Sequence, residues 1–201
     1  MKQASLPFDE VPLGPATCGL DEAGRGPLAG PVYAAAAILP EDFPLSVLDD
    51  SKALSERRRN EAFELITARA AFAIEWVGAA EIDRLNILAA SLLAMERAYL
   101  SLLSRLVARG WDRPRHILVD GNRLPHIAGA TAIVGGDGLV PAIMAASICA
   151  KVARDRAMER FDWLYPAYGY ARHKGYPTRA HRAIVLEIGS SPIQRRTFRV
   201  R

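Results

Sequence analysis

The chain has 201 residues, of which 50% are hydrophobic and 24% are charged, and its formal net charge is +4. This composition excludes a largely disordered chain, and the length fits one globular domain. The charge is uneven, because residues 1–150 carry −4 and residues 151–201 carry +8. A basic segment beside an acidic one suits a polyanion held next to carboxylates, although a merely solvated basic face is the alternative.

The N-terminal residues MKQASLPFDE contain no apolar segment of the kind found in secretory signals. The longest apolar run, residues 32–39, is too short to cross a bilayer, so we expect no membrane association. Cys18 and Cys149 lie far apart and have no zinc-finger spacing. A disulfide between them is the alternative, but we expect two buried thiols in a reducing, cytoplasmic environment.

Short apolar runs bounded by glycine, proline or charge predict five strands. These runs cover residues 17–20, 32–39, 71–77, 116–119 and 130–134. Between them lie helical patterns, beginning with a helix that Ser55 caps and that reaches about Arg69. Apolar residues at three- and four-residue steps predict one long helix over residues 85–107, which Gly110 ends.

A further helix is expected from residue 139 to about 164, with Pro141 tolerated in its first turn. A polar, aromatic loop over residues 165–178 and a last helix near residues 179–188 follow. Strands that alternate with helices after an opening hairpin-like pair predict an α/β fold with a mixed central sheet flanked by helices. We expect a single domain over residues 1–201, with a small helical appendage from about residue 164.

Acidic side chains follow three of the predicted strands, each with glycine nearby. They are Asp21, Glu22, Asp120 and Asp137. An acid after a strand is often a turn former, but strand ends meet at one edge of an α/β sheet, and three repeats of one arrangement favour metal binding. Oxygen ligands without histidine or cysteine favour Mg²⁺ or Mn²⁺. A carboxylate cage that holds two such ions is suited to phosphodiester hydrolysis.

The acids at residues 21 and 22 run into the glycine-rich turn GRGPLAG, where bare backbone lets a ligand approach closely. The stretch CGLDEAGRGPLAGPV resembles the first signature of the type 2 ribonuclease H family. Six further motifs follow in that family's order over about residues 17–198. They are DDSKALSE (49–56), EIDRLNIL (81–88), VDGN (119–122), GGD (135–137), AASICAKVARD (145–155) and HKGYPT (173–178).

This resemblance implies a ribonuclease H-like fold and an endoribonuclease that hydrolyses the RNA strand of RNA–DNA hybrids. It also implies nicking 5′ of ribonucleotides embedded in duplex DNA, as in ribonucleotide and RNA primer removal, with 3′-hydroxyl and 5′-phosphate products. Two Mg²⁺ or Mn²⁺ ions would be held by the four catalytic acids, Asp21, Glu22, Asp120 and Asp137. The turn of Gly24, Arg25 and Gly26 would contact the ribonucleotide, and Tyr176 would sense the RNA–DNA junction.

Other polar residues in these motifs are candidate substrate contacts. They are Ser51, Lys52, Asn122, Ser147, Lys151, His173 and Lys174. Ser147, Lys151 and Asp155 are four residues apart and share one helix face. We interpret Asp155 as an ion-pair partner that braces the site rather than as a fifth metal ligand. The remaining histidines are interpreted as structural, and Trp76, Trp111 and Trp163 are expected in the core.

The chain departs from the family pattern at Gln194, Thr197 and Gly135, where the family commonly has His, Ser and Lys. None of these positions is among the four acids, so the departures bear on substrate grip rather than on chemistry. Two other functions are weighed: a nucleic-acid-binding module without catalysis, and a DNA exonuclease with a similar carboxylate cage. A monomer is expected.

Overall fold

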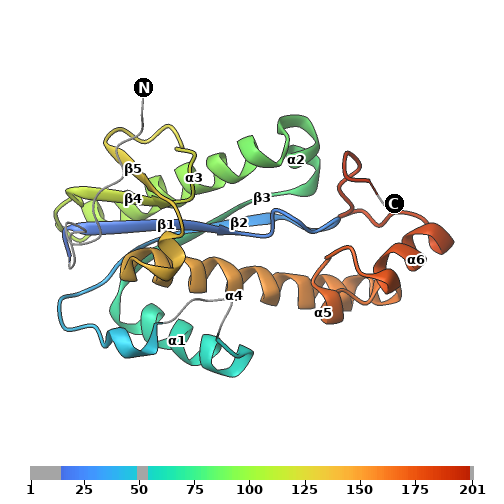
Figure 1. Cartoon of the computed structure of the whole chain (residues 1–201), viewed down its shortest axis with the longest axis horizontal. Helices are drawn as coiled ribbons and strands as arrows, with labels where there is room; N and C mark the ends of the chain where they lie inside the picture. The colour runs from blue at the N-terminus through green and yellow to red at the C-terminus, as the bar shows by residue number, and fades with distance from the viewer. Residues whose placement is uncertain (1–14, 49–53, 200–201) are drawn as a thin grey trace.

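The computed structural model describes residues 15–48 and 54–199, which form a three-layer α/β/α arrangement around one sheet (Figure 1). The sheet has the order β3-β2-β1-β4-β5. Its strands are β1 (Thr17–Ala23), β2 (Val32–Ile38), β3 (Ala71–Val77), β4 (His116–Asp120) and β5 (Ala130–Ile133). Neighbours β1, β2 and β3 are antiparallel, whereas β4 runs parallel to β1 and to β5. The predicted mixed sheet and its five strands are confirmed.

Helices cover both faces of this sheet. They are α1 (Glu56–Arg69), α2 (Ala79–Leu85), α3 (Ile87–Ala108), α4 (Pro141–Leu164), α5 (Tyr170–His173) and α6 (Arg179–Ile188). Helix α3 packs along β3 and β2 on one face, and α4 packs along β1 and β2 on the other, with α1 against α4 (Figure 1). Short 3₁₀ turns lie at Leu45–Val47 (η2), Gly136–Gly138 (η3) and Pro166–Tyr168 (η4).

Strand β2 is apolar on both faces because it lies inside the sheet between two helical layers. Ala34 and Ala36 pack into the core under α3, while Ala35 and Ala37 pack into the core formed with α1 and α4. All four alanines are fully buried. Small side chains at these alternating positions let both layers approach the sheet closely.

The predicted helix ends are confirmed where a capping residue was recognised. The Ser55 hydroxyl accepts a hydrogen bond from the Arg58 N–H, 3.3 Å away. The start of α6 near residue 179 is confirmed as well, and there Thr178, which was not predicted as a cap, accepts a hydrogen bond from the His181 N–H at 3.2 Å. Pro141 stands in the first turn of α4, where its missing N–H costs nothing.

The long helix predicted over residues 85–107 is confirmed as α3, except that it begins at Ile87, and a separate short helix, α2, which was not predicted, ends just before it. Asn86 adopts a φ of 74°. Its side chain accepts a hydrogen bond from the Ala89 N–H at 3.1 Å and so caps the N-terminus of α3. Asparagine tolerates the left-handed region better than other non-glycine residues, which explains why the boundary between the two helices falls there. The loop predicted over residues 165–178 likewise contains η4 and α5.

The expectation that the tryptophans lie in the core is also wrong. Trp76, Trp111 and Trp163 are 54%, 52% and 82% exposed. Trp76 lies on the edge strand β3, and Trp111 follows α3 with the Arg109 guanidinium 5.2 Å from its ring. The two cysteines, by contrast, are buried free thiols as expected, and burial raises the pKa of each to about 12.

By length and composition alone, α3 could cross a membrane, although core helices of soluble proteins pass the same test. Its buried residues, among them Ala94, Leu102 and Leu106, belong to the core between this helix and the sheet. The face of α3 that contacts β2 and β3 therefore has a partner within the fold.

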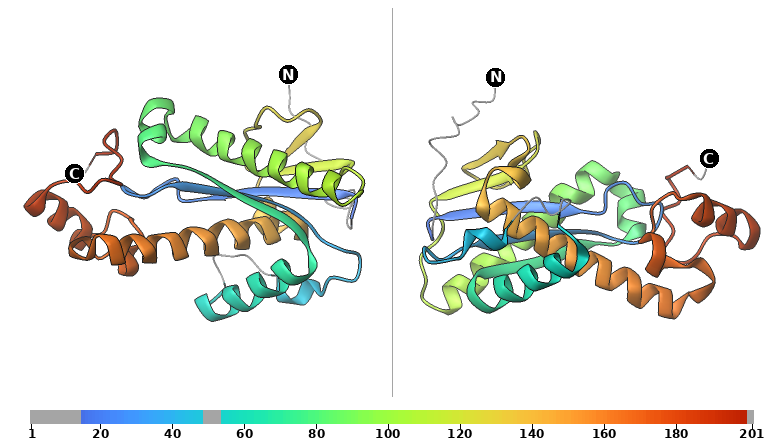
Figure 2. Two further views of the ribbon diagram at one scale, coloured as in Figure 1. Left: turned by 180° about the vertical axis from the view of Figure 1, so that it is seen from behind. Right: turned by 60° about the horizontal axis from the view of Figure 1, so that its bottom comes forward.

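The C-terminal helices extend beyond the sheet at the end of α4 (Figure 2). Helix α5 packs against α4. The segment after α6 returns to the turn that follows β1 and bonds to it through backbone groups. There, Gln194 forms an antiparallel bridge with Ala29. The helical C-terminal region expected from the sequence is thus joined to the glycine-rich turn.

Candidate active site at the carboxyl ends of strands β1 and β4

Parallel pairing of β1 with β4 brings the first acids together. Leu20 is aligned with Val119, so Asp21 and Asp120 follow at neighbouring positions on adjacent strands. Asp137 arrives from β5 through a turn in which Gly135 has a φ of 70°. Its backbone N–H donates to the Asp120 carboxylate at 3.2 Å. The sheet register therefore explains why acids far apart in sequence meet at one place.

One carboxylate oxygen from each of Asp21, Asp120 and Asp137 lies within 4.8 Å of the others. Two oxygens bound to one Mg²⁺ lie up to about 4 Å apart, so this cluster needs only a small adjustment to share an ion. The donors are all carboxylates, which suits Mg²⁺ or Mn²⁺ better than zinc. The residues present fit the divalent metal expected from the sequence.

The electrostatics of the cluster favour a cation. Burial raises the pKa of Asp21 well above its usual value, and repulsion from Glu22 and Asp120 raises it further. Burial and repulsion from Asp137 raise the pKa of Asp120. Burial likewise raises the pKa of Glu22, while the Arg25 guanidinium, 3.3 Å from its carboxylate, opposes that rise. A bound divalent ion would relieve this repulsion and keep the carboxylates ionised.

Close packing of α4 on β1 gives Asp21 a partner. A Cβ at Gly19 would lie 2.1 Å from the backbone of Ala142, so only glycine lets the helix approach this far. Asp21 follows two residues later on the same face of the strand. There, the hydroxyl of Ser147 from α4 donates a hydrogen bond to its carboxylate.

A cavity of about 280 Å³ gathers most of the candidates predicted from the sequence. Its walls are formed by Asp21, Glu22, Ala23, Gly24, Arg25, Gly26, Asp120, Asp137, Ser147, Lys151 and Tyr176. The four acids, the bare turn and the candidate junction-sensing tyrosine thus share one cavity. The structure thus places carboxylates that can bind a metal ion beside a turn whose backbone is not covered by side chains.

Asp155 has an ion-pair partner, as the sequence interpretation expected. Its carboxylate lies 2.8 Å from the Lys151 ammonium and 4.0 Å from the Arg59 guanidinium. Lys151 in turn lines the acidic cavity, whereas Asp155 does not. Asp155 therefore orients Lys151 from behind.

Three of the predicted substrate contacts do not line the cavity. Asn122 is exposed. The His173 ring accepts the Gly175 N–H at Nδ1 (3.2 Å), so its Nε2–H donates to the Tyr168 carbonyl at 2.9 Å. The Lys174 ammonium pairs with Glu159 at 2.6 Å. Ser51 and Lys52, also predicted, lie outside the described residues.

Two of the departures from the family pattern have structural partners. The Thr197 hydroxyl donates to the Asp83 carboxylate at 2.7 Å. Gln194 is 4% exposed and forms the bridge to Ala29. Neither residue lines the acidic cavity. Among the histidines interpreted as structural, His181 is fully buried, while His116 and His126 are exposed.

The sequence analysis missed Arg154 and Arg195, which are fully buried behind the glycine-rich turn. Arg154 lies within AASICAKVARD, and Arg195 lies near the C-terminus. Their guanidinium groups bond to backbone carbonyl oxygens. Carbonyl partners leave no trace in residue types or spacing, so no sequence signal could have found this arrangement.

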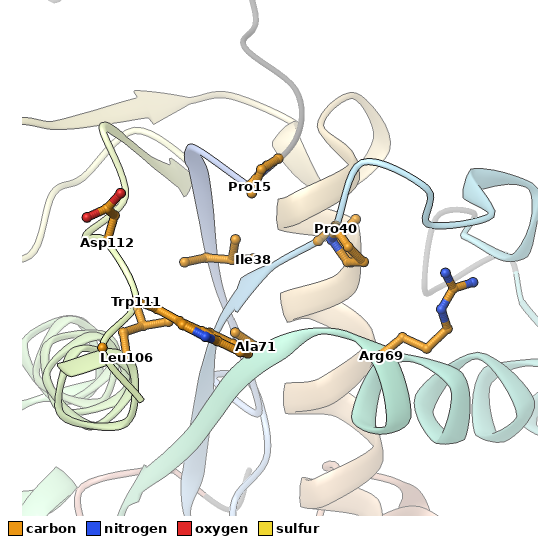
Figure 3. A pocket seen from close by; sticks show the side chains of 10 residues that line it. Pro15, Ile38, Pro40, Arg69, Ala71, Leu106, Trp111 and Asp112 are labelled. Atoms are coloured by element: carbon orange, nitrogen blue, oxygen red, sulfur yellow. The ribbon is translucent and has the colours of Figure 1, made fainter. Parts of the chain in front are cut away.

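A larger cavity of about 440 Å³ lies at the opposite ends of the strands (Figure 3). It is lined by Ile38 and Ala71, which mark the end of β2 and the start of β3, and Trp111 lies along it. Of the described residues in its walls, Asp112 is the one acid. Without a cluster of ligands, this cavity offers no comparable chemistry.

Comparisons with known proteins agree with the family that the sequence motifs resemble. The family model described as Ribonuclease HII matches residues 18–201. Ribonuclease HII of Treponema denticola is 50% identical over 194 residues, covering 92% of this chain and 98% of that protein. The crystal structure of ribonuclease H2 from Pyrococcus horikoshii OT3 has a TM-score of 0.71 at 27% identity, covering 92% of this chain and 94% of that one.

A third similarity concerns the fold alone. The structure of Bst-RNase HIII in complex with Mn²⁺ superposes with a TM-score of 0.73 at 18% identity. It covers 96% of this chain and 70% of that one. Both structural neighbours have the ribonuclease H-like fold that the sequence resemblance implied.

Proposed function

The chain belongs to the ribonuclease HII family and is a ribonuclease H enzyme, and from that premise we propose that it nicks duplex DNA 5′ of embedded ribonucleotides as well as cutting RNA–DNA hybrids. The observation that carries this proposal is the shared cavity, in which the acids stand beside the bare turn and Tyr176. Acids alone would serve any nuclease of this fold, whereas the turn and the ring supply a means of recognising one sugar.

Asp21, Glu22, Asp120 and Asp137 are proposed to hold two divalent ions. When bound, these ions activate water and stabilise the leaving oxygen, which leaves a 3′-hydroxyl and a 5′-phosphate. The structural neighbour that binds Mn²⁺ supports the metal type, with Mg²⁺ as the other candidate. The chain's own contribution is to fix the carboxylates: Ser147 holds Asp21, and the Asp137 N–H holds Asp120.

The glycine turn is proposed to read the 2′-hydroxyl of the ribonucleotide. That hydroxyl distinguishes RNA from DNA at a single site. A Cβ at Gly26 would meet nothing nearer than the Tyr176 ring, 3.8 Å away, so this backbone is accessible from the cavity. Arg25 between the two glycines is half-exposed and positively charged, which suits a phosphate.

Tyr176 is proposed to recognise the DNA side of the junction. Its side chain is 41% exposed and borders the cavity next to Gly26. A ring in that position can stack on a deoxyribose and reject a second 2′-oxygen by steric clash. We further propose that the enzyme acts as a single-domain monomer in the cytoplasm, in ribonucleotide removal and RNA primer removal.

The test uses an end-labelled duplex with one ribonucleotide in otherwise all-DNA strands. It is incubated with Mg²⁺, Mn²⁺ or a chelator, beside an all-DNA duplex and an RNA–DNA hybrid. Metal-dependent nicking on the 5′ side of the ribonucleotide, with the all-DNA duplex intact, is the expected result. The Tyr176→Ala variant should lose activity on the mixed duplex more than on the hybrid.

Other outcomes separate the alternatives. Cutting of the hybrid alone would leave the acids' role in place and refute the account of the turn. Degradation of the all-DNA duplex from its ends would favour an exonuclease. Binding without cleavage of any duplex would favour a nucleic-acid-binding module.

A further inference from the structure

Arg154 of α4 and Arg195 near the C-terminus are both fully buried. Within residues 15–48 and 54–199, no carboxylate lies within ion-pair distance of either guanidinium. Burial lowers the pKa of both side chains, and the charge of Arg154 lowers that of Arg195 further. Two unpaired buried cations are costly unless other groups satisfy their donors.

The Arg195 side chain is satisfied by the glycine-rich turn itself. Four of its hydrogen bonds go to backbone carbonyl oxygens of that turn. They are Nη2 to Gly24 (2.6 Å), Nη1 to Arg25 (3.0 Å), Nη1 to Pro27 (2.8 Å) and Nε to Gly30 (2.9 Å). One side chain therefore fixes the carbonyl directions of almost the whole turn.

Arg154 connects the same turn to the segment that carries Tyr176. Its Nε and Nη2 donate to the carbonyls of Pro31 (3.1 Å) and Ala29 (3.3 Å). Its Nη1 donates to the Lys174 carbonyl at 3.0 Å, and its guanidinium carbon lies 5.8 Å from the centre of the Tyr176 ring. Arg154 thus touches both elements that are proposed to read the substrate.

Backbone hydrogen bonds join the same three segments. The Leu28 N–H donates to the Gly175 carbonyl at 2.8 Å, and the Arg195 N–H donates to the Leu28 carbonyl at 2.8 Å. The Gly30 N–H donates to the Ile193 carbonyl at 2.9 Å. The turn is therefore held between the Tyr176 segment and the C-terminal segment.

The chemistry of these contacts requires arginine. Its planar guanidinium presents five donors in a fixed fork, whereas lysine offers three donors on a flexible stem. Glycine at position 24 makes room for it, because a Cβ there would lie 2.0 Å from the Arg154 Nε. The bare turn thus accommodates a buried arginine as well as the expected substrate.

We propose that Arg154 and Arg195 are positioning residues that fix the spacing between the glycine turn and Tyr176, and so set the preference for a single embedded ribonucleotide over a continuous RNA–DNA hybrid. This inference rests on the proposed function. A junction must satisfy the turn and the ring together, whereas a continuous hybrid presents ribose on both sides and has no deoxyribose for the ring. A variant that loses this spacing should therefore lose more activity on the junction than on the continuous hybrid.

The test compares Arg195→Lys and Arg154→Lys with the wild type and two controls. Arg156→Lys makes the same change on the surface of α4, where Arg156 pairs with Glu64 at 2.9 Å. Leu102→Ala removes a buried side chain of α3 and lowers stability away from the turn. All variants are assayed well below their melting temperatures, with folding checked by circular dichroism.

Two readouts are measured. Hydrogen exchange at the amides of Leu28, Gly30 and residue 195 should become faster in both lysine variants, by more than in Leu102→Ala, and should not change in Arg156→Lys. The ratio of kcat/KM on the single-ribonucleotide duplex to kcat/KM on the hybrid should fall about tenfold or more. Activity on the hybrid should stay within about threefold, because the acids are untouched.

Unchanged exchange at these amides would refute the positioning role. Faster exchange with an unchanged selectivity ratio would refute the link to specificity, as would an equal fall of the ratio in Leu102→Ala. A wild-type enzyme that cuts neither substrate would overturn the proposed function and the link to specificity with it, while the exchange measurement would still decide whether the arginines order the turn.

Discussion

Asp21 is the most buried of the four acids, and the charges of Glu22 and Asp120 lie near it. It is 5% exposed, and its pKa is raised by burial and by its acidic neighbours. The Asp21 carboxylate, which the proposed chemistry needs, is therefore also destabilising in the metal-free protein, because it is buried beside like charges. Function and stability should respond in opposite directions when this charge is removed.

Replacing Asp21 with Asn should lower kcat by about 10³-fold, equivalent to about 4 kcal/mol of transition-state stabilisation. The same variant should melt at a higher temperature than the wild type in chelator, by about 2–4 °C for each kcal/mol of repulsion relieved. Thermal melts with chelator and with Mg²⁺, beside the cleavage assay, check both effects. Near-normal turnover, or a lower melting temperature in chelator, would contradict the prediction.

The two glycines that flank Arg25 should differ in their tolerance of alanine. Gly24 has a φ of 102°, and a Cβ there would meet Arg154 Nε at 2.0 Å, whereas at Gly26 the nearest atom is 3.8 Å away. We expect Gly24→Ala to lower the free energy of unfolding by about 1–3 kcal/mol. Gly26→Ala should change it by less than about 0.5 kcal/mol. Urea unfolding measures both, and equal losses would refute the steric argument.

At the scale of elements, α6 carries a buried histidine, His181, whose pKa is lowered in the folded protein. His181 is fully buried, and its Nδ1 lies 2.9 Å from the Tyr176 carbonyl. Burial lowers its pKa, the bond to Tyr176 opposes this, and the His173 ring, stacked 4.3 Å away, lowers it further. The unfolded chain therefore binds a proton more readily than the folded one.

It follows that stability from this residue is present above about pH 6.5 and is lost as the pH falls through the lowered pKa of folded His181. His181→Asn keeps a donor for the Tyr176 carbonyl without the titration. The free energy of unfolding, measured from about pH 8 to about pH 5, should fall less steeply in this variant. His116→Asn is the matched control, because His116 is exposed at the start of β4. Equal slopes in the wild type and His181→Asn would contradict the prediction.

Most elements could be predicted because their signals are local. The five strands were found from apolar runs that end at glycine, proline or charge. The bounds of α1 and α6 were found from their helical patterns, with Ser55 as the cap of α1. Helix α2 was not predicted, because its seven residues are too few to show a clear helical period of apolar side chains. The tryptophans were wrongly predicted to lie in the core because large apolar side chains are buried on average, and the average does not decide the position of a single residue.

The acids of the site could be predicted because each follows a strand, and a parallel register brings such ends together. The arginines behind the turn could not, because their partners are carbonyl groups that every residue carries. His173 and Lys174 were named for their motif, yet their side chains bond to Tyr168 and Glu159. A motif identifies a segment, and only the packing shows which of its side chains face the cavity.

At the scale of the whole molecule, the structure shows where the basic segment of the chain lies relative to the acids. The net charge of +8 over residues 151–201 begins at Lys151, which lines the acidic cavity. From there, α4, α5 and α6 continue beyond the sheet (Figure 2). The carboxylates therefore stand at the start of a basic region. This arrangement suits a duplex whose scissile phosphate lies at the acids while its flanking phosphates meet positive charge.

This arrangement predicts a salt-dependent affinity for duplexes. With Asp21→Asn at fixed Mg²⁺, log K for a duplex with one ribonucleotide should fall linearly with log[KCl] between roughly 50 and roughly 400 mM, with a slope near −0.9 per phosphate neutralised. Lys151→Gln should reduce the slope by about one, because this ammonium stands at the cavity wall.

The matched control is Arg109→Gln. Arg109 stacks on Trp111, which lines the cavity at the opposite ends of the strands (Figure 3), so its loss should leave the slope unchanged. A slope near zero in the parent variant would mean that the basic region is only a solvated surface. An equal effect of Lys151→Gln and Arg109→Gln would mean that net charge, rather than the placement of charge around the acids, governs binding.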